Sequence, residues 1–432
     1  MTAEIVVFNK NGIALAADSA VAVSISKDQA KVYNTANKLF ALSKHQPIGI
    51  MVYGSAEVMG MPWEVVVKQY RRSLKTDSFD RLDQYVDHFF DYLCNKAFSE
   101  ETYHSYVYNQ SLVFMLSVFN AVDNDVKAII DKKGEVSDDE IRDAHATQVD
   151  ANYRMMLSVL KQNRTTLKSV KPNMSKYNSH ITDLFNNICG ARPIQPGHRK
   201  KLIDAAILFS ILGPSLSRSG VVIAGFGSKE VFPHVRAFEI HKILDGKITH
   251  EEVYSEKISH DMQAAIRAFA QAGETAAFMN GLSQRFVDFC IDDMAKTFSD
   301  EFGDKIAEAL LSDKYIHEED KSEIAKKITS VGKAIHDSLK SELQTIVQRE
   351  FNSPVVDTVK FFSPTEMANM AETFVNLESF RKQVTLSSET VGGPIDIAVI
   401  TKGDGFIWIK RKHYFQPELN HQFFHNYNLR EG

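Results

Sequence analysis

The stretch TAEIVVFNKNGIALAADS, residues 2–19, decides how the fold begins. Its two apolar runs, Thr2–Phe8 and Ile13–Ala17, flank the tetrapeptide Asn9-Lys10-Asn11-Gly12. Asn-Gly between two such runs is a strong hairpin signal, because both residues tolerate positive φ. We therefore predict two antiparallel strands, with Thr2 at the start of the first and Asp18 directly after the second.

Strand-like and helical stretches alternate after this hairpin. Short apolar runs predict strands at Ala20–Ile25, Lys38–Leu42 and Ile48–Tyr53. From Pro62, apolar residues recur at i, i+3, i+4, i+7 and i+11, which is one face of a helix. A second such face follows Asp77-Ser78, which we interpret as its N-cap.

The middle of the chain reads as mostly helical between residues 100 and 215. A capping box at Ser137–Glu140 opens one helix, and Lys168–Lys176 is predicted to be a polar break. Strand character returns between residues 219 and 254, and helical spacing resumes from Ser259 to about Phe351.

The last part of the chain has its own start and turn signals. Ser363-Pro364-Thr365-Glu366 combines an N-cap, a first-turn proline and a capping glutamate, and residues 395–410 read as a hairpin. The resulting order is β, α, β, α, β. Two sheets with helices on both outer faces satisfy this order, as do other α+β layerings, and the pattern alone does not choose between them.

Composition excludes several classes of function. With 432 residues, 44% of them hydrophobic and 24% charged, the chain fits a globular protein with a large core. Its net charge of -5 gives no overall attraction to nucleic acid or to anionic membranes. No stretch approaches the roughly 20 apolar residues that cross a bilayer, and the N-terminus lacks the basic segment of a signal peptide. We expect a cytoplasmic protein without nucleic-acid or membrane partners.

Cofactor motifs are equally scarce. Cys94, Cys189 and Cys290 form an odd set without CxxC spacing, which favours reduced core thiols. The sequence contains no P-loop, GxSxG or HExxH motif. We therefore expect neither a metal nor a cofactor, and any dependence on ATP would come from a partner.

Four features of the first 55 residues, taken together, resemble a mature proteasome β subunit or HslV, which are N-terminal nucleophile (Ntn) hydrolases. Thr2 opens the first strand, and Asp18-Ser19 ends the second. The segment NKLF, residues 37–40, resembles the family's strand that carries a catalytic lysine, here Lys38. The segment VYGSA, residues 52–56, resembles the turn whose backbone amide, here that of Gly54, lines the oxyanion hole.

The resemblance implies a fold and an assembly. It implies a four-layer αββα sandwich of the α+β class whose core comprises residues 1–100, 216–285 and 356–415. Residues 101–215 and 286–355 would be helical insertions, and 416–432 a C-terminal tail. The family also implies a homo-oligomer that acts on peptide or protein substrates, with a separate ATPase or unfoldase as a further partner.

The chemistry of the matched residues is consistent with that family. A threonine hydroxyl is a poor nucleophile until a base takes its proton, and an N-terminal amine exposed by loss of Met1 can be that base. A nearby Lys38 ammonium would lower the pKa of this amine. Asp18 would hold the lysine, and the Gly54 N–H would stabilise the oxyanion. Ser19 either supports Asp18 or only satisfies the turn, and Lys31 is the rival to Lys38.

The resemblance also assigns a specificity pocket and exposes two departures. Val21, Val52 and Ala56 match positions that line the family's primary pocket, which implies apolar substrate side chains. The family's relay serine has no counterpart in AQAGET, residues 270–275. Its Asp-x-x-Ser segment is replaced by SETV, residues 388–391, where Glu389 and Thr390 are predicted substitutes in the proton relay. The alternatives are a small-molecule amidase or acylase and a non-catalytic scaffold.

Overall fold

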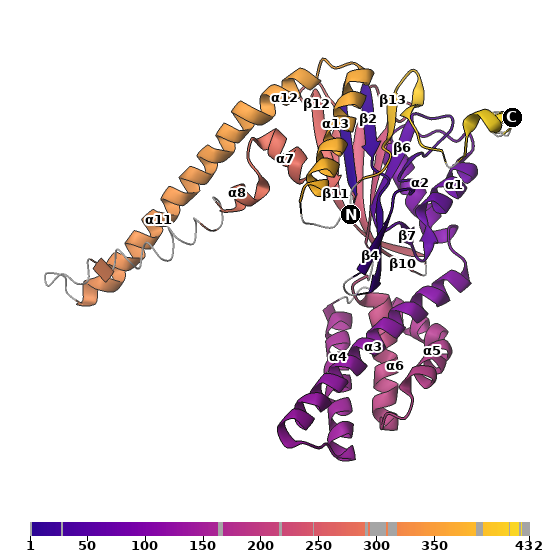
Figure 1. Cartoon of the computed structure of the whole chain (residues 1–432), viewed down its shortest axis with the longest axis vertical. Helices are drawn as coiled ribbons and strands as arrows, with labels where there is room; N and C mark the ends of the chain where they lie inside the picture. Colours follow the sequence, from indigo (N-terminus) through magenta and orange to yellow (C-terminus); the bar gives the residue numbers. More distant parts are fainter. Residues whose placement is uncertain are drawn as a thin grey trace.

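The structure is a computed structural model that describes residues 2–26, 29–162, 167–215, 218–244, 246–289, 293, 308–309, 318–385, 392–413, 415–422 and 425. It is a mixed α+β protein built around two five-stranded antiparallel sheets (Figure 1). Helices cover the outer faces of both sheets, and two helical arms project away from them.

The first sheet has the order β12-β1-β2-β13-β14. The predicted N-terminal hairpin is confirmed, because β1 pairs with β2 from Glu4↔Ala17 to Asn9↔Gly12. The expected Asn-Gly turn is wrong, because the two turn residues are Lys10 and Asn11 and neither Asn11 nor Gly12 has a positive φ. Its strands are β1 (Ala3–Asn9), β2 (Gly12–Ala17), β12 (Ala264–Ala270), β13 (Asp396–Thr401) and β14 (Gly405–Lys410).

The second sheet has the order β11-β10-β9-β6-β5. Its strands are β5 (Leu39–Ala41), β6 (Ile48–Gly54), β9 (Ser219–Gly225), β10 (His234–Leu244) and β11 (Lys247–Lys257). Two small antiparallel pairs accompany it, formed by β3 (Val21–Ser26) with β4 (Gln29–Tyr33) and by β7 (Glu57–Val58) with β8 (Met61–Pro62).

The side chains of β1 point alternately to the two faces of the first sheet, and this shows how the layers stack. Val6 and Phe8 enter a buried cluster shared with residues of the second sheet, whereas Ile5 and Val7 enter a cluster shared with helix α13 (Pro364–Gln383). This is the period of two that a fully buried strand imposes. The outer face of the first sheet also carries α7 (Gly273–Asn280) and α12 (Ser353–Val359).

The outer face of the second sheet is covered by α1 (Trp63–Leu74) and α2 (Leu82–Asn95). The same buried cluster continues into the first arm, a unit of four helices that lies below the two sheets in Figure 1. These helices are α3 (Glu100–Lys133), α4 (Asp138–Gln162), α5 (Leu167–Cys189) and α6 (Pro196–Leu212).

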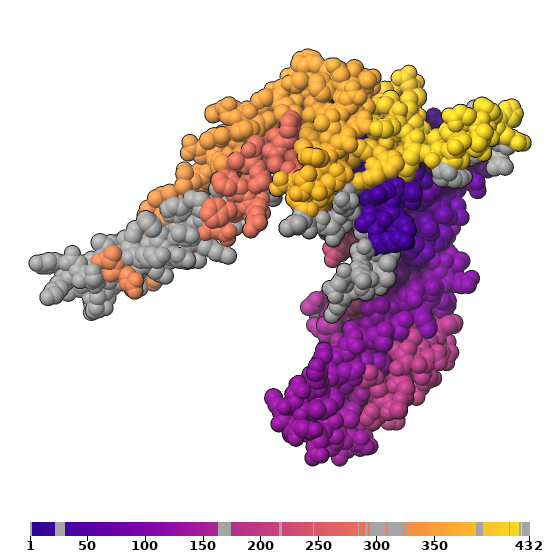
Figure 2. Space-filling view, viewed as in Figure 1, coloured from indigo at the N-terminus to yellow at the C-terminus, as the bar shows by residue number. Residues whose placement is uncertain are grey.

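The second arm is dominated by one long helix, α11 (Glu318–Ile346), which a π-helical turn (Val347–Asn352) joins to α12. Figure 2 shows the two arms leaving the sandwich in different directions. A short helix, α8 (Gln284–Asp288), follows α7, and a 3-10 turn (Pro417–Leu419) lies near the C-terminus. Among the described helices, none has the length and apolar composition needed to cross a membrane.

The helix predicted from Ser259 is wrong at its start. Residues 264–270, AAIRAFA, form strand β12, which pairs with β1 from Asn9↔Ala264 to Ala3↔Ala270. A short apolar run of this kind fits a helix or a strand equally well by periodicity. The free edge of β1 decides the outcome, because its N–H and C=O groups require partners.

The polar break predicted at Lys168–Lys176 is also wrong, since it lies within α5. That helix buries Tyr177, Ile181 and Phe185 in the cluster shared with α3 and α6. Most helical stability in proteins comes from packing of one face, so tertiary contacts outweigh the polar local composition.

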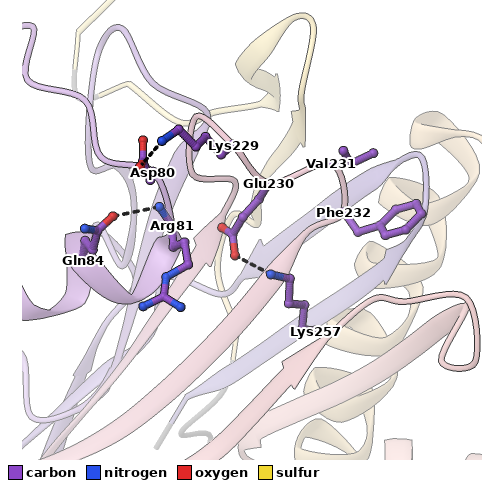
Figure 3. A pocket seen from close by; sticks show the side chains of 8 residues that line it. All are labelled: Asp80, Arg81, Gln84, Lys229, Glu230, Val231, Phe232 and Lys257. Atoms are coloured by element: carbon purple, nitrogen blue, oxygen red, sulfur yellow. Dashed lines mark hydrogen bonds and ion pairs between the residues drawn. The ribbon is translucent and has the colours of Figure 1, made fainter.

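The cap predicted at Asp77-Ser78 is wrong for a long-range reason. Helix α2 begins at Leu82, whose N–H donates to Glu230 Oε2 at 2.9 Å. Glu230 also accepts from Gly227 N at 2.8 Å. Figure 3 shows its contact with Lys257, whose Nζ donates to it at 2.7 Å. A carboxylate 148 residues away therefore satisfies the first N–H of the helix, while the local Gln84 side chain accepts from the N–H of the N-cap residue Arg81 at 3.1 Å.

A close approach between strands β6 and β9 gives a testable prediction. A Cβ at Gly220 would lie 1.9–2.1 Å from three ring atoms of Tyr53, whose ring stacks on Phe269 of the first sheet at 5.9 Å. We expect Gly220→Ala to lower the free energy of unfolding by about 1–3 kcal/mol, because the ring must move. Urea denaturation measures this change.

The matched comparison is the double variant Tyr53→Ala/Gly220→Ala, in which the ring is absent. Its loss of stability should be smaller than the sum of the two single losses, because the clash needs both side chains. Strictly additive losses would contradict this account of Gly220.

Candidate active site

The side chains of Thr2, Asp18 and Lys38 meet in one buried cluster. Thr2 directly precedes β1, Asp18 follows β2, and Lys38 directly precedes β5 of the other sheet. Lys38 Nζ donates to Thr2 Oγ1 at 3.0 Å and to Asp18 Oδ1 at 2.7 Å. Its third hydrogen bond goes to the Ala20 carbonyl at 2.6 Å, so each proton of the ammonium has an acceptor.

The Asp18 carboxylate is held by backbone as well as by Lys38. Its Oδ1 accepts from Ala3 N at 3.2 Å, and its Oδ2 accepts from Ala20 N at 3.3 Å and from Gly392 N at 3.0 Å. Its exposed fraction is 1%, and that of Lys38 is 5%. Four donors fix this carboxylate, so its position does not depend on the lysine alone.

Burial lowers the pKa of Lys38, while the Asp18 carboxylate acts in the opposite direction. The pKa falls overall, so loss of hydration outweighs the attraction between the two charges. Such a buried pair contributes little to stability by itself. A charged pair kept at that cost beside a hydroxyl is a candidate for function.

The backbone of Thr2 is anchored by the residues that follow β12. Gln271 N donates to the Thr2 carbonyl at 2.9 Å, directly after Ala270, which has a φ of 62°. The stretch without a relay serine therefore does lie beside Thr2. The Thr275 hydroxyl in this stretch donates instead to Glu378 Oε1 at 3.1 Å.

Ser19 connects the Asp18 turn to the loop before β13. Its hydroxyl donates to the Pro394 carbonyl, and its N–H donates to the Gly392 carbonyl at 3.1 Å. These contacts hold the loop that places the Gly392 N–H on Asp18. The predicted relay residues Glu389 and Thr390 lie outside the described residues.

Gly54 ends strand β6, and the backbone of this strand is hydrogen-bonded to that of Lys38. Val52 N donates to the Lys38 carbonyl at 2.9 Å. Gly54 has a φ of 79°, and a Cβ there would lie 2.6 Å from the Arg218 carbonyl oxygen. The same carbonyl accepts from Ser55 N at 3.0 Å. Only glycine fits this position without strain.

The residues predicted to line a specificity pocket differ in their surroundings. Val52 is buried in the cluster beneath α1 and α2, Val21 is partly buried, and Ala56 is exposed. Three cavities of about 510, 310 and 250 Å³ are lined by other residues. The specificity role of the three residues stays a prediction. The described residues contain no cluster of His, Cys, Asp or Glu that could bind a metal ion.

Glu4 is the member of this cluster that the sequence reasoning missed. On β1 it lies between Thr2 and Val6, on the side that faces the second sheet. Its exposed fraction is 0%, and neither carboxyl oxygen has a hydrogen-bond partner among the described residues. Burial raises its pKa well above the usual range, and Lys38 opposes this shift. The available signal was a charged residue at an inward position of an otherwise apolar strand.

Comparisons with known proteins give little further guidance. The chain matches no protein-family model and no curated protein. One similar solved structure is an Anbu (Gly-1) mutant from Hyphomicrobium sp. strain MC1, with 10% sequence identity over 99% of this chain and 95% of that chain. Its TM-score is 0.27. Such a likeness carries no argument about function, which has to be made from the site.

The Gly54 geometry predicts the effect of a substitution. Gly54→Ala should destabilise the protein, because positive φ costs a non-glycine residue about 1–2 kcal/mol and the new Cβ also meets the Arg218 carbonyl. The matched control is Gly60→Ala, which has a φ of 77° but no described atom within 4 Å of the new Cβ. Urea denaturation should show the larger loss for Gly54→Ala. Equal losses would exclude the Arg218 contact as a constraint.

The Lys38–Asp18 pair predicts a second outcome. Lys38→Met leaves the Asp18 carboxylate buried without its counter-charge, and breaking such a pair costs about 3–5 kcal/mol. Adding Asp18→Asn should restore part of this loss in urea denaturation, because the remaining charge is removed. A double variant no more stable than Lys38→Met would show that the two charges are not coupled.

Proposed function

We propose that the chain is a proteasome-like Ntn hydrolase in which Thr2, exposed by removal of Met1, cleaves amide bonds. One observation carries the proposal: a buried Lys38 ammonium donates both to the Thr2 hydroxyl oxygen, at 3.0 Å, and to Asp18, at 2.7 Å. A hydroxyl and an amine on the same terminal residue supply nucleophile and base together.

The reaction would proceed through an acyl-enzyme. The Thr2 amine takes the hydroxyl proton as Oγ1 attacks the substrate carbonyl carbon, and the carbonyl oxygen becomes an oxyanion. The Gly54 N–H is the proposed donor to that oxyanion, a contribution of about 3–4 kcal/mol in comparable enzymes. The C–N bond then breaks, and the proton held by the amine passes to the leaving nitrogen. Water releases the acyl group from Thr2 and restores both groups.

Lys38 would tune this chemistry without exchanging a proton. Its positive charge beside Oγ1 favours the negative charge that develops there, and it lowers the pKa of the Thr2 amine. Asp18 keeps the ammonium in place. Ser19 is assigned the supporting role of holding the Gly392 loop on Asp18.

The fold is consistent with this proposal at the level of its layers. Two stacked sheets with helices on both outer faces correspond to the αββα sandwich that the resemblance implies. We assign the core to residues 1–100, 216–285 and 356–415, and the two arms to insertions at 101–215 and 286–355. Residues 416–432 form the proposed tail.

The substrate is proposed to be a peptide or protein, cleaved by a homo-oligomer in the cytoplasm. Val21, Val52 and Ala56 are the proposed contacts for an apolar substrate side chain. A separate ATPase or unfoldase would be needed for folded substrates, because the sequence has no P-loop.

Covalent labelling tests the proposal. Protein shown by intact mass to start at Thr2 is treated with a peptide epoxyketone, whose two electrophilic carbons react with a hydroxyl and an adjacent amine. We expect one adduct, mapped to Thr2 by tandem mass spectrometry. Thr2→Ala should give none, and Lys38→Met should label about 100-fold more slowly, because the charge that stabilises the developing negative charge is removed.

A form with an uncleaved N-terminal tag is the matched control, because it keeps the fold and the hydroxyl but lacks the free Thr2 amine. Labelling of the tagged form at the same rate would contradict the role of the amine. Absence of an adduct on correctly processed protein would leave the non-catalytic scaffold as the better description. Turnover of short acyl amides but not of peptides would point to the amidase or acylase alternative.

A further inference from the structure

Two carboxyl groups in the Thr2 site have opposite environments. Asp18 accepts hydrogen bonds from three backbone N–H groups and from Lys38. Glu4 is completely buried, and among the described residues neither of its oxygens has a donor. An ionised carboxylate without donors is strongly disfavoured in a buried site, whereas a neutral carboxyl is tolerated. Two carboxyls kept apart in this way often have different roles in one reaction.

The position of Glu4 places it within the site. Thr2, Glu4 and Val6 alternate along one face of β1, and that face points to the second sheet. Across the first sheet, Glu4 is paired with Ala17 on β2 and with Phe269 on β12. The direct neighbours of Glu4 within the first sheet are therefore uncharged. One strand further, Ala17 pairs with the buried Asp396 of β13, which accepts from Lys412.

The charged and titratable groups that face Glu4 come from several elements. Lys38 lies before β5 and Asp18 after β2, and both act on its ionisation. Tyr53 on β6 is close enough to Glu239, Glu4 and Arg267 for their ionised forms to act on the pKa of its phenol. Burial raises the pKa of Tyr53 to about 12, so the phenol stays neutral at physiological pH. Lys412 acts on Lys38 from the first-sheet side.

We propose that Glu4 is a second carboxyl of the Thr2 site, uncharged at neutral pH, and that its ionisation ends the pH range in which Thr2 reacts. The part that concerns reactivity rests on the proposed function. Glu4 is a positioning residue in this scheme, because it makes no hydrogen bond to Thr2 among the described contacts.

The sign of the effect follows from the charges. When Glu4 is neutral, the opposite charges of Lys38 and Asp18 cancel, so the three side chains together carry no net charge. Attack builds negative charge on Thr2 Oγ1 and on the substrate oxygen, and it needs a neutral amine as base. An ionised Glu4 would repel that negative charge and would favour the protonated amine. The reactive form is therefore the one in which Glu4 carries its proton.

The first experiment measures the proton on Glu4 without using activity. Wild type and Glu4→Gln are unfolded in urea from pH 5 to pH 9. In folded wild type Glu4 keeps a proton that the unfolded chain has lost, so wild-type stability falls as pH rises. The ratio of the unfolding constants, wild type over variant, should rise by up to about tenfold per pH unit and then level off at the pKa of folded Glu4.

Glu378→Gln is the matched control for this measurement. Glu378 is also buried, at 3% exposure, but one of its oxygens accepts from Glu274 N, Thr275 N and the Thr275 hydroxyl. The ratio of unfolding constants for this pair is the reference against which the ratio for Glu4→Gln is compared. A flat ratio for Glu4→Gln would overturn the claim that Glu4 is uncharged, whatever the activity of the protein.

The second experiment measures the rate at which a β-lactone acylates Thr2 across the same pH range. Glu4→Gln mimics the neutral acid, so its rate relative to wild type should increase with pH, by about tenfold per unit above the pKa of Glu4. Glu4→Asp can still ionise, so its rate of acylation should still fall at high pH.

The outcomes separate the two proposals. Superimposable pH profiles, together with a rising ratio of unfolding constants, would overturn the action of Glu4 on Thr2. A folded Glu4→Gln that is unreactive at every pH would overturn it as well, by making Glu4 a required proton donor. Wild type that is never acylated would overturn the proposed function, while the unfolding experiment would still decide the charge of Glu4.

Discussion

The ammonium group of Lys38 is the point on which the described site depends. It precedes a strand of the second sheet, yet two of its three acceptors, Thr2 Oγ1 and Asp18 Oδ1, belong to the ends of strands in the first. The contact therefore requires the two sheets to be stacked in one particular register. Packing of the apolar faces between them supplies that register, and the polar cluster occupies one end of the same interface.

The sequence made part of this arrangement predictable because the decisive contacts there are local. A hairpin that turns at Lys10-Asn11, with Asn9 paired to Gly12, leaves Thr2 and Asp18 at the same end of adjacent strands. The role of Lys38 was predicted from the family resemblance and not from the periodicity of the sequence. Strand β12, the Glu230 cap of α2 and the buried Glu4 were missed, because each depends on residues far away in the chain. Local patterns describe neighbours in sequence, and these features need neighbours in space.

The turn at Gly54 shows how a distant segment constrains the site. The first helical arm ends with α6 at Leu212, and the chain re-enters the second sheet at Ser219. Just before that strand, the Arg218 carbonyl contacts the Gly54–Ser55 turn and excludes a side chain at Gly54. The exit of the helical arm thus packs directly against the turn whose amide is assigned to the oxyanion. The helical arm is therefore attached to the core at a place where a small shift of the Arg218 backbone would also move the Gly54–Ser55 turn.

The buried polar groups argue for function more strongly than the resemblance does. Loss of hydration lowers the pKa of Lys38 despite a carboxylate at 2.7 Å, and it raises that of Glu4 despite a nearby ammonium. Both shifts mean that the folded state disfavours the usual charge of the group, so neither residue is retained for the stability that its charge provides. Replacing buried charged groups by apolar side chains of similar volume is often neutral or stabilising. Their presence around the Thr2 hydroxyl is explained if the site handles protons.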